Sequence, residues 1–199
     1  MSNAFHPPLG TGINRRRFLN SGQAFLSAGV VAMLAGCAGN AAMPMSSGSA
    51  EGDVAILNVA LGLEHEAIAA YQIGAESKLL DKPVLDVAVL FQGHHKEHRD
   101  ALAATVRKLG GVPVEPRMMN DYAMALNAGA IRSQGDILVL AARLERGAAN
   151  AYLGVIPSFR DAELAKIAGR LAADETMHWT ALAGALKQNL PQKAFSFAA

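Results

Sequence analysis

Apolar residues recur along this chain at alternating steps of four and three positions, the spacing of the buried face of an α-helix. Four long segments carry the pattern: 53–80, 83–109, 134–156 and 161–188. A shorter helix is expected at 121–127, between the second and third. Four amphipathic helices of this length can bury their apolar faces only against one another. The pattern therefore predicts an all-α fold, an up-down four-helix bundle.

The connections between these segments set the expected topology. Asp81-Lys-Pro83 and Pro157-Ser-Phe-Arg160 are short, so each should join two antiparallel neighbours. Gly110-Gly111 stops the second helix, and residues 112–132 then form a stretch too long for a tight turn. We expect this stretch to be a long crossover between helices 2 and 3. Asp53 is expected to cap the first helix, and Ser133 the third.

Ionisable residues lie at the middle of all four apolar faces. The fourth helix places Glu175 and His178 three residues apart, within the register Leu164, Ala168, Leu171, Glu175, His178, Leu182, Ala185. The other candidates that share a buried face are Glu64 and Tyr71 on the first helix, His95 and His98 on the second, and Glu145 and Tyr152 on the third. A buried carboxylate needs a polar partner or a metal ion at the same depth. By helical phase, His94, His65, Glu66, Glu97 and Arg99 are expected to be solvated.

The two helical hairpins repeat each other. Glu64 precedes Tyr71 by seven residues and His98 by 34, while Glu145 precedes Tyr152 by seven and His178 by 33. These offsets predict a pseudo-twofold internal repeat, with one Glu-and-Tyr helix and one His helix in each half. The tyrosines are two turns from their glutamates, roughly 10 Å along a helix axis, so we expect them beside the ligands and not among them.

Composition narrows the class of protein. The chain has 199 residues, a formal net charge of +1 and one cysteine, Cys37. It is long enough for one domain, it lacks the cysteines of a disulfide scaffold, and it lacks the positive charge of a nucleic-acid binder.

The first 37 residues are expected to be an export signal. Asn14-Arg-Arg-Arg-Phe-Leu-Asn20 resembles a twin-arginine motif, and the apolar run after it is too short to span a membrane. Leu34-Ala-Gly-Cys37 resembles the lipobox of bacterial lipoproteins, which implies a lipid anchor on Cys37 and a periplasmic location. Cleavage nearby without lipidation is the alternative. Removing residues 1–37 removes three arginines and no acidic residue, so the net charge falls to −2.

The rest of the chain divides into three parts. Residues 38–52, rich in Ser, Gly and Ala, are expected to be a flexible tether. Residues 53–190 form the predicted bundle, and 191–199 a C-terminal tail.

At these residues the chain resembles the ferritin-like superfamily of dinuclear carboxylate proteins, which carry a Glu on helices 1 and 3 and Glu-x-x-His on helices 2 and 4. Five of the six ligand positions agree: Glu64, His98, Glu145, Glu175 and His178. A closer resemblance is to small bacterial ferritin-like domain proteins that carry a twin-arginine signal. The resemblance implies one or two iron or manganese ions, with zinc as a competitor. It also implies that Glu175 bridges the ions.

The sixth position departs from the family pattern, because His95 stands where the family has a second bridging glutamate. Three carboxylates leave two divalent ions with a charge of +1. Three arrangements stay open: His95 as an extra ligand of a dinuclear site, a mononuclear site, or a metal-free core in which imidazoles pair with glutamates.

Three classes of function follow from these alternatives. A dinuclear site implies chemistry with dioxygen or peroxide, ferroxidase-like or peroxidase-like. The others are an envelope metal binder without turnover and a structural or stress-related scaffold. Mineral storage is disfavoured, because a lipid anchor on every chain does not suit a closed cage. No cysteine motif for an iron–sulfur centre or for haem attachment is present in the sequence. A homodimer, formed with a second copy of the chain, is the protein partnership that the prediction allows.

Overall fold

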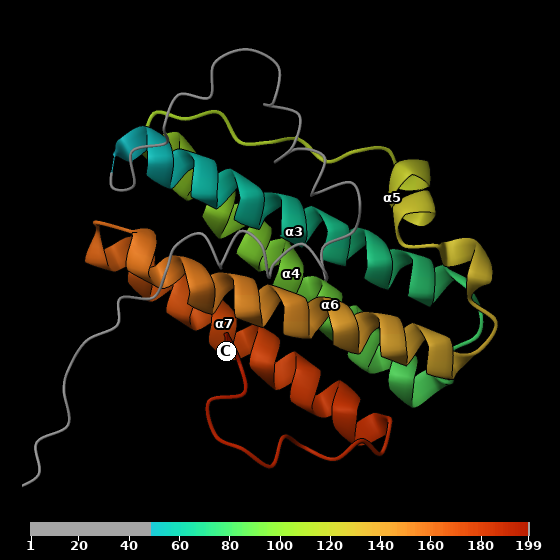
Figure 1. Ribbon diagram of the computed structural model, residues 1–199. Helices are drawn as coiled ribbons and strands as arrows, with labels where there is room; N and C mark the ends of the chain where they lie inside the picture. The colour runs from blue at the N-terminus through green and yellow to red at the C-terminus, as the bar shows by residue number, and fades with distance from the viewer. Residues whose placement is uncertain (1–48, 199) are drawn as a thin grey trace, which may run out of the picture.

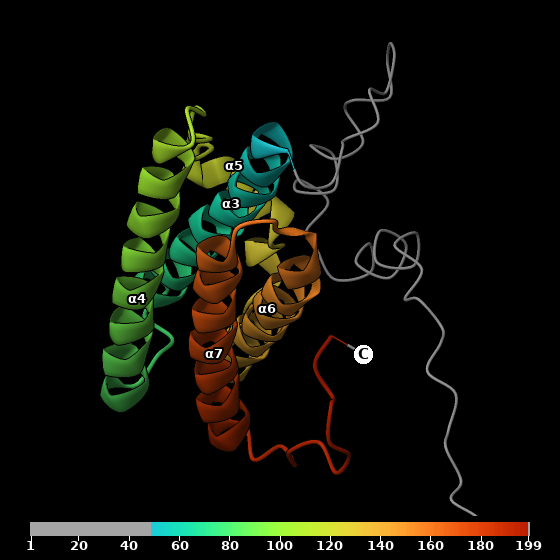
Figure 2. The ribbon, with the colours of Figure 1, turned by 90° about the vertical axis from the view of Figure 1, so that its left-hand side faces the viewer.

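The computed structural model describes residues 49–198, and every regular element in that range is helical. Four long helices, α3 (Ala50–Glu76), α4 (Lys82–Lys108), α6 (Gln134–Val155) and α7 (Ala162–Ala185), enclose a common interior (Figure 2). A short helix, α5 (Met119–Ala125), packs against α3, and two 3₁₀ turns, η2 (Ala128–Ala130) and η3 (Ile156–Ser158), flank α6. The predicted all-α bundle is confirmed.

The chain forms two antiparallel hairpins, α3 with α4 and α6 with α7. Helices α4 and α6 run in the same direction, so the segment between them travels the length of the bundle (Figure 1). This is the predicted crossover. The segment is anchored on the way, because Asn58 of α3 donates to the carbonyl of Val112 and accepts from the amide of Val114.

Side-chain caps begin the helices. Asp81, Ser133 and Asp161 each accept a hydrogen bond from a backbone amide in the first turn of α4, α6 and α7. The prediction for α3 was wrong: Ser49 is its cap, accepting from Gly52, and Asp53 lies inside the helix, where it is buried. The serine lies one turn earlier and starts the helix there. At the other end α3 stops at Glu76, because Lys78 adopts a left-handed φ of 62°.

By length and composition alone, α3 is apolar enough to cross a membrane. Half of its most apolar window is nevertheless buried inside the bundle. It packs against α4, α5 and α6 and so forms part of the core of the bundle. The core has two main apolar clusters. One is built around Leu57 and Leu102, the other around Phe91 and Leu182. On each long helix, the ionisable residues at mid-helix lie between residues of one cluster and residues of the other.

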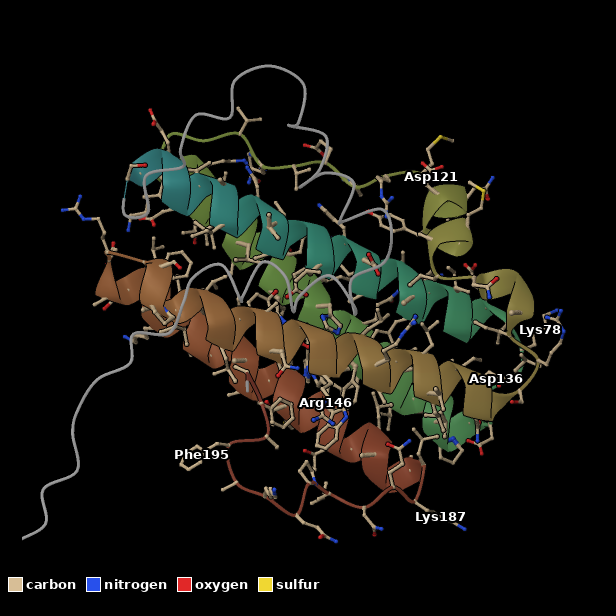
Figure 3. The ribbon with its side chains drawn as sticks, viewed as in Figure 1. Lys78, Asp121, Asp136, Arg146, Lys187 and Phe195 are labelled. Atoms are coloured by element: carbon tan, nitrogen blue, oxygen red, sulfur yellow. The ribbon has the colours of Figure 1, made fainter. Side chains whose placement is uncertain are left out.

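The C-terminal segment folds back onto α6 and α7. The Phe197 ring meets the Trp179 ring edge-on, with centroids 5.3 Å apart. The Arg146 guanidinium lies 5.4 Å from the Trp179 ring centroid and 5.5 Å from that of Phe197, and it donates to the Ser196 carbonyl. Figure 3 shows Arg146 beside this segment, with Phe195 directed away from the bundle.

Replacing Phe197 with alanine is expected to lower the free energy of unfolding by about 1–2 kcal/mol. The ring is half-buried and loses both its aromatic and its cation–π contact. Urea unfolding followed by Trp179 fluorescence measures the change at the contact itself. Phe195→Ala is the matched control, since that ring is 94% exposed. Equal effects of the two substitutions would contradict the packing of this segment.

Candidate metal centre

Six ionisable side chains from all four long helices meet in the middle of the bundle, and each is at most 8% exposed. They are Glu64 from α3, His95 and His98 from α4, Glu145 from α6, and Glu175 and His178 from α7. All six were predicted to lie on buried helix faces, and the structure brings them together. A core with three carboxylates and three imidazoles at this depth needs internal partners or bound cations.

The six residues form two overlapping groups of four. Glu64 and His98 form one group with His95 and Glu175, and Glu145 and His178 form the other with the same two residues. Within each group, the potential ligand atoms lie within 4.8 Å of one another. His95 and Glu175 therefore lie between two positions, each of which offers two carboxylates and two imidazoles.

His95 connects the two halves. Its Nδ1 lies 2.7 Å from Glu64 Oε2 and its Nε2 lies 3.1 Å from Glu145 Oε1. Both ring nitrogens are therefore used, one toward each hairpin. The residue stands at the position related by the repeat to Glu175, 80 residues further on.

Two of the buried tyrosines, Tyr71 and Tyr152, each bond the glutamate of the opposite hairpin. Tyr71 donates its hydroxyl hydrogen to Glu145 Oε1, and Tyr152 donates to Glu64 Oε1. Burial raises the pKa of both hydroxyls well above the usual value, and the neighbouring carboxylates raise it further. Both hydroxyls therefore stay protonated and hold the carboxylates in place.

The Nε2 atoms of His98 and His178, which face away from the glutamates, also have polar neighbours. His98 Nε2 lies 3.2 Å from Asp174 Oδ2, and His178 Nε2 lies 2.9 Å from His94 Nδ1. Each support reaches across from the facing helix, and His94 and Asp174 are themselves 80 residues apart. These bonds leave the Nδ1 atoms of His98 and His178 directed at the glutamates. Outer hydrogen bonds of this kind orient histidines that bind metals.

The expectation that His94 is fully solvated was wrong. It is half-buried, because α4 and α7 pack closely enough for its ring to stack on that of His178, with centroids 5.2 Å apart. His65 and Glu66 are also buried, contrary to the prediction. His65 Nε2 lies 3.1 Å from the Val114 carbonyl, so the crossover covers this face of α3. The position of a residue around its helix shows whether it faces the bundle core. It does not show that α7 covers His94 or that the crossover segment covers His65.

Several atoms of the cluster lack hydrogen-bond partners. Among residues 49–198, neither carboxylate oxygen of the fully buried Glu175 has a hydrogen-bond partner, and neither does His98 Nδ1. Glu175 Oε1 lies 3.2 Å from His98 Nδ1, but the pair is not aligned for a hydrogen bond. Buried polar atoms without partners are rare, and here they belong to two neighbouring residues of the cluster, His98 and the shared Glu175. Carboxylate oxygens and imidazole nitrogens are the donor set of iron, manganese and zinc, so the residues present fit such ions.

Comparison with known proteins identifies the family of this fold. The model of the ferritin-like domain family matches residues 52–188, which include all six cluster residues. The chain belongs to this family. No curated protein matches it. A conserved hypothetical protein from Mycobacterium tuberculosis, known from a crystal structure, is 24% identical. The match has a TM-score of 0.60 and covers 75% of this chain and 99% of that one, which shows a shared fold.

In this ferritin-like domain, the pKa values of the cluster residues are shifted by burial and by the other members of the cluster. Burial alone would lower the pKa of His95, but hydrogen bonds to Glu145 and Glu64 outweigh it and hold the pKa well above its usual value. Burial is outweighed in the same way at His98, where carboxylates raise the pKa to about 10. At Glu175, burial raises the pKa to about 7, and the nearby Glu145 adds to the effect. Protons can therefore balance the cluster in the absence of a cation.

The expected export signal (1–37) and Cys37 lie outside the described residues, as does most of the 38–52 tether.

Proposed function

We propose that this ferritin-like protein binds two first-row transition-metal ions, iron or manganese in the first place and zinc as a competitor. The observation that carries the proposal is the pair of overlapping four-residue groups, in which the shared Glu175 has two buried oxygens without partners. Glu64 and His98 would bind one ion and Glu145 and His178 the other. Glu175 lies where one carboxylate could reach both.

His95 sets the charge of this centre. Three carboxylates cannot neutralise two divalent ions, and an imidazole adds no negative charge. The centre would keep a charge of +1, so it favours an added anion such as hydroxide or peroxide. His95 also separates this chain from the family pattern, because it stands where the family has a glutamate, and in this structure its two nitrogens bond Glu64 and Glu145.

Iron or manganese at such a centre supplies redox chemistry with dioxygen or peroxide, and we place this protein in the ferroxidase-like or peroxidase-like class. The chain's own contribution is positional. Tyr71 and Tyr152 hold the two end carboxylates, Asp174 and His94 orient the imidazoles, and the apolar clusters on both sides exclude water. A binder without turnover would use the same ligands, and peroxide consumption and dioxygen uptake distinguish it from an enzyme.

A metal-free scaffold is the second candidate, and the His95 contacts favour it. Three histidines and three glutamates can pair with one another by sharing protons, and such a network needs no cation. In this case neither purified nor reconstituted protein would hold metal.

The location remains a proposal from the sequence. The twin-arginine motif at Arg15 and Arg16 supports export, and Cys37 in its lipobox-like setting supports a lipid anchor in the periplasm. Mass spectrometry of the mature N-terminus tests both.

The double substitution Glu175→Ala and His178→Ala is expected to reduce bound metal at least tenfold, because it removes the shared carboxylate and one end imidazole. Elemental analysis of the chain from about residue 38, purified from its own compartment without added metal, gives the reference. About two ions per chain supports the dinuclear centre and about one a mononuclear site. Unchanged metal content in the variant would reject the assignment.

The control for this experiment is His65→Ala, which removes a buried histidine outside the cluster. It should retain the metal of the unaltered protein. Circular dichroism of both variants separates loss of ligands from loss of the fold.

A further inference from the structure

An apolar cavity of about 260 Å³ lies beside the cluster. Its lining residues are at the end of the bundle where α3 ends and α4 begins. Figure 1 shows this end of the bundle near the connection between the two helices. All four long helices line the cavity, with Tyr71 and Phe91 on the side of the cluster. Small residues of all four helices make the space, among them Gly74, Ala88, Ala141 and Ala181. Val87, which is 40% exposed, and Ala181 lie at the surface and mark its mouth.

The internal repeat shows that the fold does not require this cavity. The related space at the other end of the bundle, beside Tyr152, has only about 10 Å³. Most residues that line this small space correspond through the repeat to residues that line the cavity, for example Tyr152 to Tyr71, Ala168 to Ala88 and Leu57 to Leu138. The filled end has Val155 where the open end has Gly74, and Phe159 closes it as well. One end of the bundle is therefore filled by side chains, and the related end is not.

The wall chemistry restricts what can enter. The one side-chain polar atom in the lining, the Tyr71 hydroxyl, is already bonded to Glu145. A buried water needs two to four polar partners, so the cavity offers little to water and nothing to a sugar, nucleotide or peptide. It is larger than the roughly 150 Å³ apolar cavity known to bind benzene. It has room for an alkyl segment on the order of six to eight carbons.

The inner wall is one ring thick. The Phe91 ring stacks on His178 with centroids 4.0 Å apart, and the Tyr71 ring lies 5.4 Å from that of His95. A molecule that touches these two rings from the cavity is therefore separated from the cluster by a single side chain.

We propose that this cavity is a binding site for the alkyl chain of a small amphipathic molecule, with the chain end at Tyr71 and Phe91 and the polar head at the mouth beside Val87. The lining excludes a polar group from the interior, and the unequal ends of the bundle identify the cavity as a feature of this half. Binding of the chain does not depend on a metal in the cluster.

Calorimetric titration of metal-free protein with butan-1-ol, hexan-1-ol, octan-1-ol and decan-1-ol tests the site. Affinity should rise about fourfold for each added CH₂ until the cavity is full near eight carbons, and then level off. Octane-1,8-diol should bind at least tenfold more weakly than octan-1-ol, because its second hydroxyl would be buried without a partner. Affinity that is independent of chain length, or absent for every alcohol, would overturn the proposal.

A matched pair of variants locates the binding. Ala181→Phe puts a ring into the mouth from an exposed position on α7 and should weaken octan-1-ol binding at least tenfold, as should Ala185→Phe. Ala173→Phe lies on the same helix, also exposed but outside the cavity, and should leave binding unchanged. Equal binding by Ala181→Phe, Ala185→Phe and the unaltered protein would place the alcohol elsewhere.

The orientation has its own readout, which rests on the proposed metal centre. In protein loaded with Mn²⁺, NMR lines of the octan-1-ol terminal methyl should broaden more than those of the CH₂ beside the hydroxyl. The reverse order would overturn the orientation. If Mn²⁺ does not bind, no selective broadening occurs while calorimetric binding persists, so failure of the metal centre is distinguishable from failure of the cavity site.

Discussion

Replacing His95 with glutamate is expected to destabilise the metal-free protein and to increase its affinity for two divalent ions, on the order of 100-fold. The substitution restores the fourth carboxylate of the ferritin-like pattern. It removes the imidazole that bonds Glu64 and Glu145 at 2.7 Å and 3.1 Å. The two effects have opposite signs, and both follow from charge.

In the metal-free protein, the cluster of three carboxylates and three imidazoles can balance itself with protons. The variant has four carboxylates and two imidazoles in the same buried volume, so some carboxylates must be protonated or remain unpaired. Breaking a buried pair of this kind costs about 3–5 kcal/mol, which for a domain of this length lowers Tm by roughly 10 °C. With two divalent ions, four carboxylates give a neutral centre.

The measurement is the melting temperature of both proteins with and without Mn²⁺ or Zn²⁺ under anaerobic conditions. The metal-dependent rise in Tm should be much larger in His95→Glu, because ions bound only by the folded state stabilise it. His65→Glu is the control, since it introduces a glutamate at a buried histidine outside the cluster. Loss of stability without a larger metal response in His95→Glu would contradict the charge argument.

The fold was predictable because the four-three spacing of apolar residues fixes which helix faces are buried. The same spacing predicted all six residues of the cluster, since a glutamate or histidine on the apolar face of a helix must point into the bundle. The contacts that could not be predicted depend on neighbours remote in sequence. The spacing of His94 shows only that it is off the core face of α4, and its contact with His178 depends on how closely α7 approaches.

Two other features show the same limit. The bonds from Tyr71 to Glu145 and from Tyr152 to Glu64 cross between hairpins, whereas the sequence offsets link each tyrosine to the glutamate of its own helix. The cavity beside Tyr71 depends on the absence of side-chain volume at several positions at once. A list of apolar residues does not show it until the structure aligns the two ends of the bundle.

The two halves of the centre are expected to bind metal with unequal affinity, the half with Glu64 and His98 more tightly. Asp174 accepts from His98 with a carboxylate, whereas the related support of His178 is the imidazole of His94. A carboxylate that accepts from the outer nitrogen makes a histidine a stronger ligand and adds a negative charge near the ion. An imidazole orients its partner without adding that charge.

Substituting each of the two supporting residues, His94 and Asp174, tests this directly. His94→Asp should make the halves alike and tighten the weaker ion about 10- to 100-fold, while Asp174→Ala should weaken the tighter ion by a similar factor. Competition titration with Zn²⁺ and a coloured chelator resolves the two dissociation constants, which should be separate in the unaltered protein and merge in His94→Asp. Ala101→Asp, on the exposed side of α4, controls for the added charge. If it tightens binding as much as His94→Asp, the effect is long-range attraction. If only His94→Asp acts, the outer hydrogen bond of a single histidine sets the order in which the two positions fill.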